Sequence, residues 1–284
     1  MTPIDPALRI RSVTLAVSDI ARSLDFYEHK LGLPLIAREN GSAQLGGVPE
    51  RPALELVEIE APTPLPPGAS GLYHVAWLHP SRAALADTVR RVAGARWPLE
   101  GASDHGVSEA LYLSDPDGLG IEIYADRARE QWPRTPDGAL QMVTLPLDLE
   151  DLLEQSDVAP GAQVAPGTAI GHVHLKVADV ERARDFYRDA VGMDEQASMP
   201  AAAFMSAGGY HHHIGLNAWQ SAGAPPAPAS APGLRRLEFE LSGGRELQQL
   251  GERLQRGGAE PAGAGAVSDE LLVVDPDGEL LAFA

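Results

Sequence analysis

The side chains best suited to chemistry in this sequence are histidines in segments of alternating hydrophobicity. His74 lies in LYHVAWL, His172 and His174 lie in IGHVHLKV, and residues 211–213 are three consecutive histidines. A neutral imidazole binds transition metals, and its pKa near neutrality suits acid–base catalysis. The chain has no cysteine, which excludes disulfides, thiolate catalysis and thiolate metal ligands. A metal site would therefore need nitrogen and oxygen ligands, although a single histidine on a strand is more often a packed residue than a ligand.

These histidines belong to an internal repeat. Residues 13–33 recur as residues 173–193, and the sequence Asp-Pro-Asp-Gly occurs at 115–118 and again at 275–278. One long unit has therefore been duplicated. The two copies keep different polar residues, and the differences indicate where the chemistry lies.

Each copy divides again into two modules. Residues 10–17 alternate apolar and polar side chains, which predicts a strand, and Asp19 is placed to begin a helix that ends near Gly32. Short strand-like runs follow, so each module reads as βαβββ. Modules one to four cover residues 10–60, 71–126, 170–219 and 234–284, with linkers at 61–70, 127–168 and 221–233 and one short helix expected at 147–155.

Composition narrows the class of protein. A chain of 284 residues is long enough for two domains with cores of their own. The formal net charge of −18 disfavours nucleic acid and anionic membranes as partners. No apolar run approaches the ~18 residues of a membrane span. We therefore expect a soluble cytoplasmic protein whose partner is a small molecule.

The motifs together resemble the vicinal oxygen chelate superfamily, the glyoxalase/bleomycin-resistance/extradiol-dioxygenase fold. They are Val-x-Leu-x-Val-x-Asp followed by Asp-Phe-Tyr and Gly, and the Asp-Pro-x-Gly turn before the last strand. The resemblance implies an α+β fold in which four βαβββ modules form two pairs of curved mixed sheets. It also implies two domains, at 9–126 and 169–284, joined by the linker at 127–168. Members of this superfamily often assemble into homo-oligomers.

In this superfamily the metal ligands come from the first and last strands of a module. The first-strand ligand position, just before the valine of the repeat, holds Ser12, His74, His172 and Arg236 in modules one to four. The last-strand position after the Asp-Pro-Asp-Gly turn holds Glu122 in module two and Ala282 in module four. The resemblance thus implies His74, Glu122 and His172 as the metal ligands. His174 is the competitor for His172, and we expect it to pack around the site without binding the metal.

This ligand set has a topological consequence. Pairing of modules in sequence order would leave neither pair with a complete site. A complete site requires module two to pair with module three, which leaves modules one and four as an inert pair. Two imidazoles and one carboxylate form the facial arrangement typical of non-heme Fe(II). Mn(II) is the alternative metal, and nitrogen and oxygen ligands also permit Co, Ni or Zn.

Three further residues match the ring-cleaving members of the superfamily. The segment with His212 before His213-Ile214-Gly215 resembles their His-x-Ile/Leu-Ala strand, whose histidine is the acid–base catalyst. On such a strand, His211 and His213 would face one side and His212 the other. The series His105-Gly, Tyr112, Asp-Pro-Asp-Gly and Glu122 resembles the segment in which histidine contacts oxygen and tyrosine contacts the catechol. A polar strand edge for the histidines and a core position for Tyr112 are the plainer alternatives.

The resemblance therefore implies Fe(II)-dependent extradiol (meta) cleavage of a catechol-type aromatic diol with O2, as in catechol 2,3-dioxygenases of aromatic compound catabolism. One rival is a metal-dependent lyase, isomerase or transferase of the glyoxalase type. Such enzymes usually carry a second carboxylate on the other last strand, where module three has histidines. The other rival is a non-catalytic protein that binds small molecules, and such members usually lack the three ligands.

Overall fold

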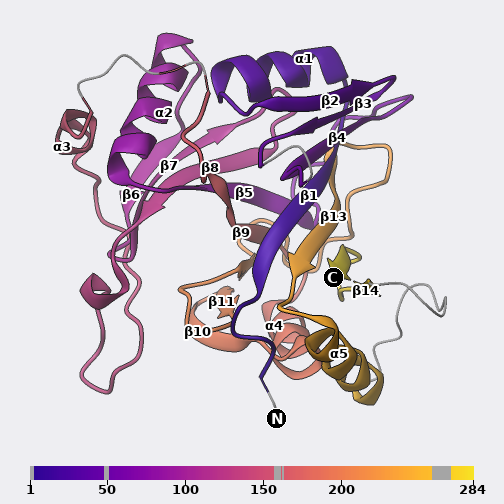
Figure 1. Cartoon of the computed structure of the whole chain (residues 1–284). Helices are drawn as coiled ribbons and strands as arrows, with labels where there is room; N and C mark the ends of the chain where they lie inside the picture. The colour runs from indigo at the N-terminus through magenta and orange to yellow at the C-terminus, as the bar shows by residue number, and fades with distance from the viewer. Residues whose placement is uncertain (1–2, 48–50, 157–160, 162, 258–269) are drawn as a thin grey trace.

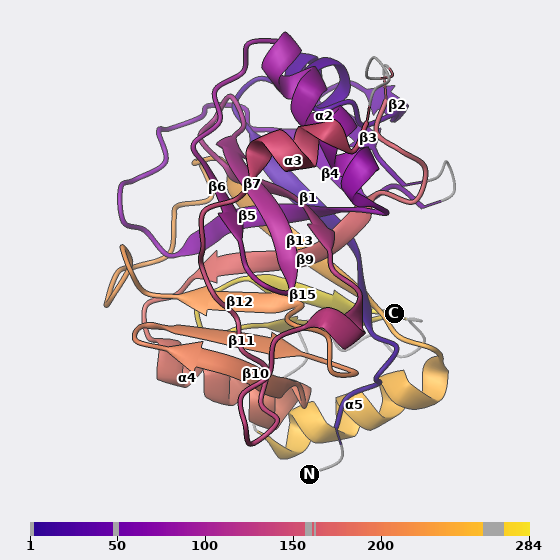
Figure 2. The same ribbon diagram turned by 90° about the vertical axis from the view of Figure 1, so that its left-hand side faces the viewer.

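The computed structural model describes residues 3–47, 51–156, 161, 163–257 and 270–284, and all structural statements refer to these residues. Two sheets form the centre of the molecule, and helices cover their outer faces at opposite ends (Figures 1 and 2). One large cluster of buried apolar side chains fills the space between strands and helices.

The first sheet combines modules one and four. In spatial order its seven strands are β14 (Leu271–Val274), β15 (Leu280–Phe283), β13 (Gly233–Glu240), β1 (Arg9–Val17), β4 (Leu54–Glu58), β3 (Ser42–Leu45) and β2 (Leu35–Glu39). The strand β1 pairs with β13 in antiparallel fashion and with β4 in parallel fashion, so the sheet is mixed.

The second sheet combines modules two and three. In spatial order its eight strands are β10 (Asp194–Met199), β11 (Ala202–Ser206), β12 (Ile214–Asn217), β9 (Ala169–Lys176), β5 (Gly71–His79), β8 (Gly120–Asp126), β7 (Ser108–Ser114) and β6 (Gly101–Asp104). Antiparallel pairing of β5 with β9 joins the two modules. The predicted pairing of module two with three, and of one with four, is confirmed.

The helices lie where the sequence places them. They are α1 (Ile20–Leu24), continued by the π-helical turn η1 (Asp25–Lys30); α2 (Arg82–Gly94); the short 3₁₀ helix η2 (Arg129–Gln131); α3 (Leu149–Glu154); α4 (Val180–Asp185), continued by the π-helical turn η3 (Phe186–Val191); and α5 (Gly244–Arg256). The side chains of Asp19, Ser81 and Asp179 accept hydrogen bonds from the first turns of α1, α2 and α4, as N-cap residues do. The helix expected at 147–155 is α3.

The fold is the expected α+β arrangement of modules. Modules one to three each show one strand, a helix and three more strands. Module four shows β13, α5, β14 and β15, and residues 258–269 lie outside the described part of the chain. Each sheet contains strands from both predicted domains, and the division at 9–126 and 169–284 stays a prediction.

The two repeated motifs contact each other. The Tyr27 hydroxyl at the end of the first helix donates to Asp115 Oδ2 at 3.1 Å, and Tyr187 donates to Asp275 Oδ2 at 3.0 Å. The other oxygen of Asp115 accepts the backbone amides of the Asp-Pro-Asp-Gly turn. Gly118 in that turn has a φ of 81°, which glycine tolerates best. Tyr27 and Tyr187 are therefore core residues, and each ties a helix to the turn of the next module.

Candidate metal centre and cavity

Three neighbouring strands place the predicted ligands on one face of the second sheet. Ala76 of β5 lies opposite Glu122 of β8 on one side and opposite His172 of β9 on the other. His74 is two residues from Ala76 on the same strand, and residues two apart on a strand share a face. Pairing of strands from modules two and three therefore brings three side chains together that are far apart in the sequence.

The three side chains are in contact. Glu122 Oε2 lies 3.0 Å from His74 Nε2 and 3.2 Å from His172 Nε2. One potential ligand atom from each residue falls within 4.8 Å of the others. The residues are 5%, 3% and 1% exposed for His74, Glu122 and His172. Among the described residues, this is the one cluster of histidine, cysteine or acidic side chains with the spacing of a metal site.

The protonation of the cluster suits a cation. Burial lowers the pKa of His172 to about 4, so its imidazole is neutral at pH 7. Burial by itself would raise the pKa of Glu122, but contacts with His172 and His74 outweigh it and hold that pKa well below its usual range. An ionised carboxylate beside the neutral imidazole of His172 suits metal binding, which requires deprotonated ligands.

Two nitrogens of the cluster, His74 Nε2 and His172 Nδ1, also lack a hydrogen-bond partner among the described residues. His74 Nε2 is buried and, within the described part of the chain, has no hydrogen-bond partner, since its approach to Glu122 does not have hydrogen-bond geometry. Buried polar atoms in proteins normally have a hydrogen-bond partner or bind a water molecule or an ion. The residues present therefore fit a divalent metal held by two nitrogens and one oxygen.

His174 lies beside this cluster but outside it. It is directly opposite His74 in the β5–β9 register, and the two rings are 5.1 Å apart. The His174 ring packs over Gly215, where an added Cβ would approach the ring to 2.7 Å. Burial lowers the pKa of His174 well below its usual value. The geometry favours His172 over His174 as the third member of the cluster.

A cavity of about 410 Å³ opens on the cluster. His74 and Glu122 form part of its wall, together with His105, Tyr112, His174 and His212. The rest of the wall is mainly apolar and includes Val107, Met142, Val143, Met199, Phe204 and Trp219. No lysine or arginine is among the described lining residues. A mostly apolar cavity with a few convergent polar groups is typical of a small-molecule site.

His105 and Tyr112 form a hydrogen-bonded pair at this cavity. His105 Nε2 lies 2.6 Å from the Tyr112 hydroxyl, and His105 Nδ1 lies 2.8 Å from the carbonyl oxygen of Val143. Because a carbonyl only accepts, Nδ1 carries the hydrogen, and in the neutral ring Nε2 accepts from Tyr112. The Tyr112 ring is 5.8 Å from that of His74. Both predicted residues therefore lie at the cavity, with Tyr112 next to the metal cluster.

The three consecutive histidines are placed differently from the sequence interpretation. We expected them on a strand with His212 facing away from His211 and His213. The structure places all three in a bend before β12, which begins at Ile214, and buries all of them. His212 lines the cavity, with its ring 4.0 Å from that of His172. His211 lies behind it, and His213 Nδ1 accepts from the Ala207 amide.

Several cavity residues were missed by the sequence analysis. Residues 142–144 belong to a segment interpreted only as a linker, yet they line the cavity. The backbone of Val143 exchanges hydrogen bonds with the backbone and side chain of His105. Phe204 and Trp219 come from module three, and nothing in their sequence context marks them. Only contact between distant segments assigns these residues to the site.

The first sheet has no comparable cluster among its described residues. Ser12 donates to Glu238 Oε2 at 2.9 Å, and Arg236 forms ion pairs with Glu238 and Glu270. Ala282 is buried in β15. The ligand positions of modules one and four are thus occupied by a hydroxyl, a guanidinium and a methyl group, as predicted.

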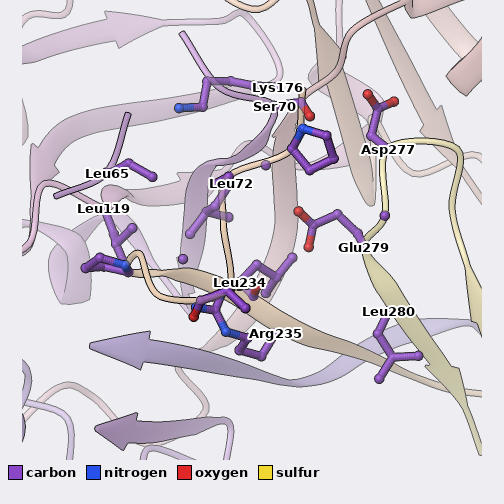
Figure 3. Close-up of a pocket in the computed structure, with 17 residues that line it drawn as sticks. Leu65, Ser70, Leu72, Leu119, Lys176, Leu234, Arg235, Asp277, Glu279 and Leu280 are labelled. Atoms are coloured by element: carbon purple, nitrogen blue, oxygen red, sulfur yellow. Dashed lines mark hydrogen bonds between the residues drawn. The ribbon is translucent and has the colours of Figure 1, made fainter. Parts of the chain in front are cut away.

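A second cavity, of about 200 Å³, lies where the two sheets meet (Figure 3). Leu72 at the start of β5, Lys176 at the end of β9 and Arg235 at the start of β13 contribute to its wall. Glu279 points into it from the side opposite Leu119 (Figure 3). Arg235 donates to the carbonyl oxygens of Leu234, Ala229 and Ala231. This cavity lacks the imidazoles of the first.

No helix in the described ranges is long and apolar enough to cross a membrane.

Comparison with known proteins identifies the family. The family described as Glyoxalase/Bleomycin resistance protein/Dioxygenase superfamily matches residues 9–123 and 169–283. The chain belongs to this superfamily. A curated relative from Bacillus subtilis (strain 168), named catechol-2,3-dioxygenase, is 40% identical over 262 residues, which cover 91% of each chain. That relative supports a dioxygenase-type enzyme.

Solved structures of the superfamily share the fold. A provisionally named dioxygenase from Bacillus subtilis subsp. subtilis str. 168 has a TM-score of 0.66 at 14% identity and covers 100% of this chain and 86% of its own. Glyoxalase I from Zea mays has a TM-score of 0.58 at 16% identity, covering 98% of this chain and 92% of its own. At such low identities the likeness shows the fold alone.

Proposed function

We propose that this protein is an Fe(II)-dependent extradiol dioxygenase that cleaves a catechol-type aromatic diol with O2. The observation that carries the proposal is the buried cluster of His74, Glu122 and His172 beside a cavity that also holds Tyr112 and His212. The 40% identical relative named catechol-2,3-dioxygenase supports the same reaction class.

His74, His172 and Glu122 would hold the metal. Two imidazoles and one carboxylate suit Fe(II), with Mn(II) as the alternative, and leave open positions for other ligands. When bound, such a metal supplies the redox chemistry that brings an aromatic diol and O2 together. The deprotonated donor set needs no proton release from Glu122 at neutral pH, because its pKa is already low.

The surrounding side chains would position the diol and move its protons. Phe204, Met142 and Trp219 offer apolar surface to an aromatic ring and exclude water from the cavity. Tyr112, fixed by its hydrogen bond to His105, would contact a diol oxygen. His212 would take a proton from the diol and return one later in the reaction.

A glyoxalase-type lyase, isomerase or transferase is the second candidate, favoured by the fold shared with glyoxalase I from Zea mays. An enzyme of that type would need a second carboxylate on the last strand of module three. That strand is β12, Ile-Gly-Leu-Asn, which has none. The bend before β12 presents His212 to the cavity instead. A non-catalytic binding protein would not need the buried ligand cluster.

Replacement of the carboxylate ligand tests the proposal. We expect Glu122→Gln to lose at least about 90% of bound iron and of ring-cleaving activity, because a neutral amide replaces the anionic ligand. Iron would be measured by mass spectrometry after anaerobic purification, and activity by O2 uptake and absorbance of the ring-opened product. Circular dichroism would verify folding.

Glu238→Gln is the matched control, since Glu238 is a carboxylate of the first sheet that bonds Ser12 and Arg11. It should retain iron and activity. Full iron content and turnover in Glu122→Gln would refute the ligand set. Stoichiometric zinc or nickel without O2 uptake would favour the glyoxalase-type alternative.

A further inference from the structure

A chain of hydrogen bonds lies directly behind His212. His211 Nε2 lies 2.9 Å from Asp126 Oδ1, and His211 Nδ1 lies 2.8 Å from His212 Nδ1. Asp126 is the last residue of β8, the strand that carries Glu122, and His211 is 0% exposed. His212 Nε2 is the ring nitrogen that takes no part in this chain. Because His212 lines the cavity, the chain links a carboxylate behind the site to a ring nitrogen at it.

The Asp126 carboxylate at the end of the chain fixes which atom donates in each of these hydrogen bonds. A carboxylate only accepts, so His211 Nε2 carries a hydrogen. A neutral His211 ring then has a lone pair on Nδ1, and His212 must donate to it from Nδ1. The neutral His212 ring consequently has no hydrogen on Nε2. The tautomer of His212 is thus set by Asp126, two hydrogen bonds away.

The opposite direction would require a fully buried His211 cation. Its ring is packed against Trp132, at 5.5 Å between centroids, and Tyr210, at 4.1 Å. His172 and His212 are also neighbours, at 5.9 and 4.8 Å. Asp126 would pair with such a cation, but that attraction must first repay the cost of burying the charge.

We infer that Asp126 and His211 are positioning residues that hold His212 as the Nδ1–H tautomer, with the Nε2 lone pair free to accept a proton from the diol. The inference rests on the proposed function. In that step the diol O–H bond breaks, its electron pair stays on oxygen, and a new N–H bond forms at His212 Nε2. The charge created on His212 is stabilised by Asp126 through the polarised hydrogen bonds of His211.

The carboxylate end of the chain is itself fixed. Asp126 Oδ2 accepts from the Tyr210 hydroxyl at 2.9 Å, and that hydroxyl lies 2.8 Å from the hydroxyl of Tyr124. Both oxygens of Asp126 therefore accept hydrogen bonds, and Asp126 cannot turn away from His211 without breaking one. Tyr124 and Asp126 both belong to β8. The strand β8 thus carries both Glu122 and the carboxylate that ends the Asp126–His211–His212 chain of hydrogen bonds. We call this chain the relay.

Asp126→Asn tests the relay because an amide can donate where a carboxylate only accepts. With the asparagine amide donating to His211 Nε2, both hydrogen bonds reverse and the hydrogen of His212 moves to Nε2. We expect kcat to fall by about 10²–10⁴-fold, the range seen when a catalytic histidine is held in the wrong tautomer or lost. KM and iron content should change little, since the ligands and cavity wall are intact.

The direct readout is independent of turnover. Long-range ¹H–¹⁵N NMR of ¹⁵N-histidine-labelled, metal-free, full-length protein distinguishes Nδ1–H from Nε2–H rings, and His212→Phe identifies the His212 signals. We expect His212 to be Nδ1–H in the wild type and Nε2–H in Asp126→Asn. Glu109→Gln is the matched control, since Glu109 is a buried carboxylate of β7 that pairs with Arg82. It should leave the tautomer and kcat unchanged.

The outcomes separate the two proposals. An Nε2–H ring for His212 in the wild type would overturn the relay, and so would an unchanged tautomer and kcat in Asp126→Asn. The wild-type spectrum decides the point even where the variant does not fold. Wild-type protein that shows the expected tautomer but cleaves no diol would reject the proposed function instead.

Discussion

At the scale of single residues, the site combines one anion with neutral imidazoles. Burial keeps His172 neutral and lowers the pKa of His212 well below its usual value, while Glu122 stays ionised. The rest of the cavity wall is mainly apolar, and none of its described residues is a lysine or arginine. We therefore expect the diol of the proposed reaction to carry little charge on its other substituents.

This wall predicts selectivity for uncharged diols. We expect kcat/KM for 3-methylcatechol to exceed that for 3,4-dihydroxybenzoate by at least about tenfold, because the cavity offers no cation to a buried carboxylate. The rate of O2 uptake, measured over a range of concentrations of each diol, would give the two kcat/KM values. Met142→Lys, which places an ammonium group on the cavity wall, should reduce the difference in kcat/KM between the two diols. Equal kcat/KM for both diols in the wild type would contradict the prediction.

At the scale of elements, β12 shows how tightly the strands must fit around the histidines. Gly215 lies opposite His174 in the β12–β9 register. A glycine in a strand often marks a close approach of another group, and here that group is the His174 ring. The His174 ring is also 5.1 Å from that of His74, so a shift of His174 would reach the candidate metal centre.

Gly215→Ala should therefore disturb both stability and the site. The new Cβ would lie 2.7 Å from His174 Cγ, so the ring must shift. We expect a loss of about 1–3 kcal/mol in the free energy of unfolding, as for other overpacked cores, together with reduced iron content. Urea denaturation and metal analysis measure the two effects. Gly94→Ala is the control, because nothing lies within 4 Å of its added Cβ; equal behaviour of the two variants would refute the packing argument.

At the scale of the whole molecule, the two sheets meet at the cavity that contains Glu279. Burial raises the pKa of the Glu279 carboxyl to about 8, with the charge of Asp275 adding to the effect and Arg235 opposing it. The ionised form is thus disfavoured in the folded protein. Between pH ~4.5 and ~8 the folded chain keeps a proton that the unfolded chain releases, so this residue lowers stability as pH rises through that window.

Glu279→Gln should remove this pH dependence. We expect a small change in Tm at pH 5 and an increase at pH 8.5, of about 2–4 °C for each kcal/mol recovered. Thermal unfolding of both proteins at the two pH values, followed by circular dichroism, measures it. Glu60→Gln, at an exposed position just before the first linker, should leave the pH dependence of Tm as it is. A Tm gain in Glu279→Gln that is equal at both pH values would contradict the prediction.

From the sequence alone we predicted the modules, their pairing and the three residues of the candidate metal centre. The repeat aligns Ser12 with His172, and the absence of ligands in modules one and four leaves modules two and three as the pair that can complete a site. Strand alternation then places His74, Glu122 and His172 on one face, because local geometry fixes which side chains share a face. The modules follow from the chain's own periodicity, whereas the ligand positions, and with them the expected pairing, come from the resemblance to the superfamily.

Tertiary structure alone decided the conformation of residues 211–213, the role of residues 142–144 at the cavity, and the link from Asp126 to His212. Each depends on contact between segments that are distant in the sequence. Strand alternation predicted the wrong arrangement for the three histidines, and the carboxylate that bonds His211 comes from another module, 85 residues away. Packing, which propensity and spacing do not encode, selects among these arrangements.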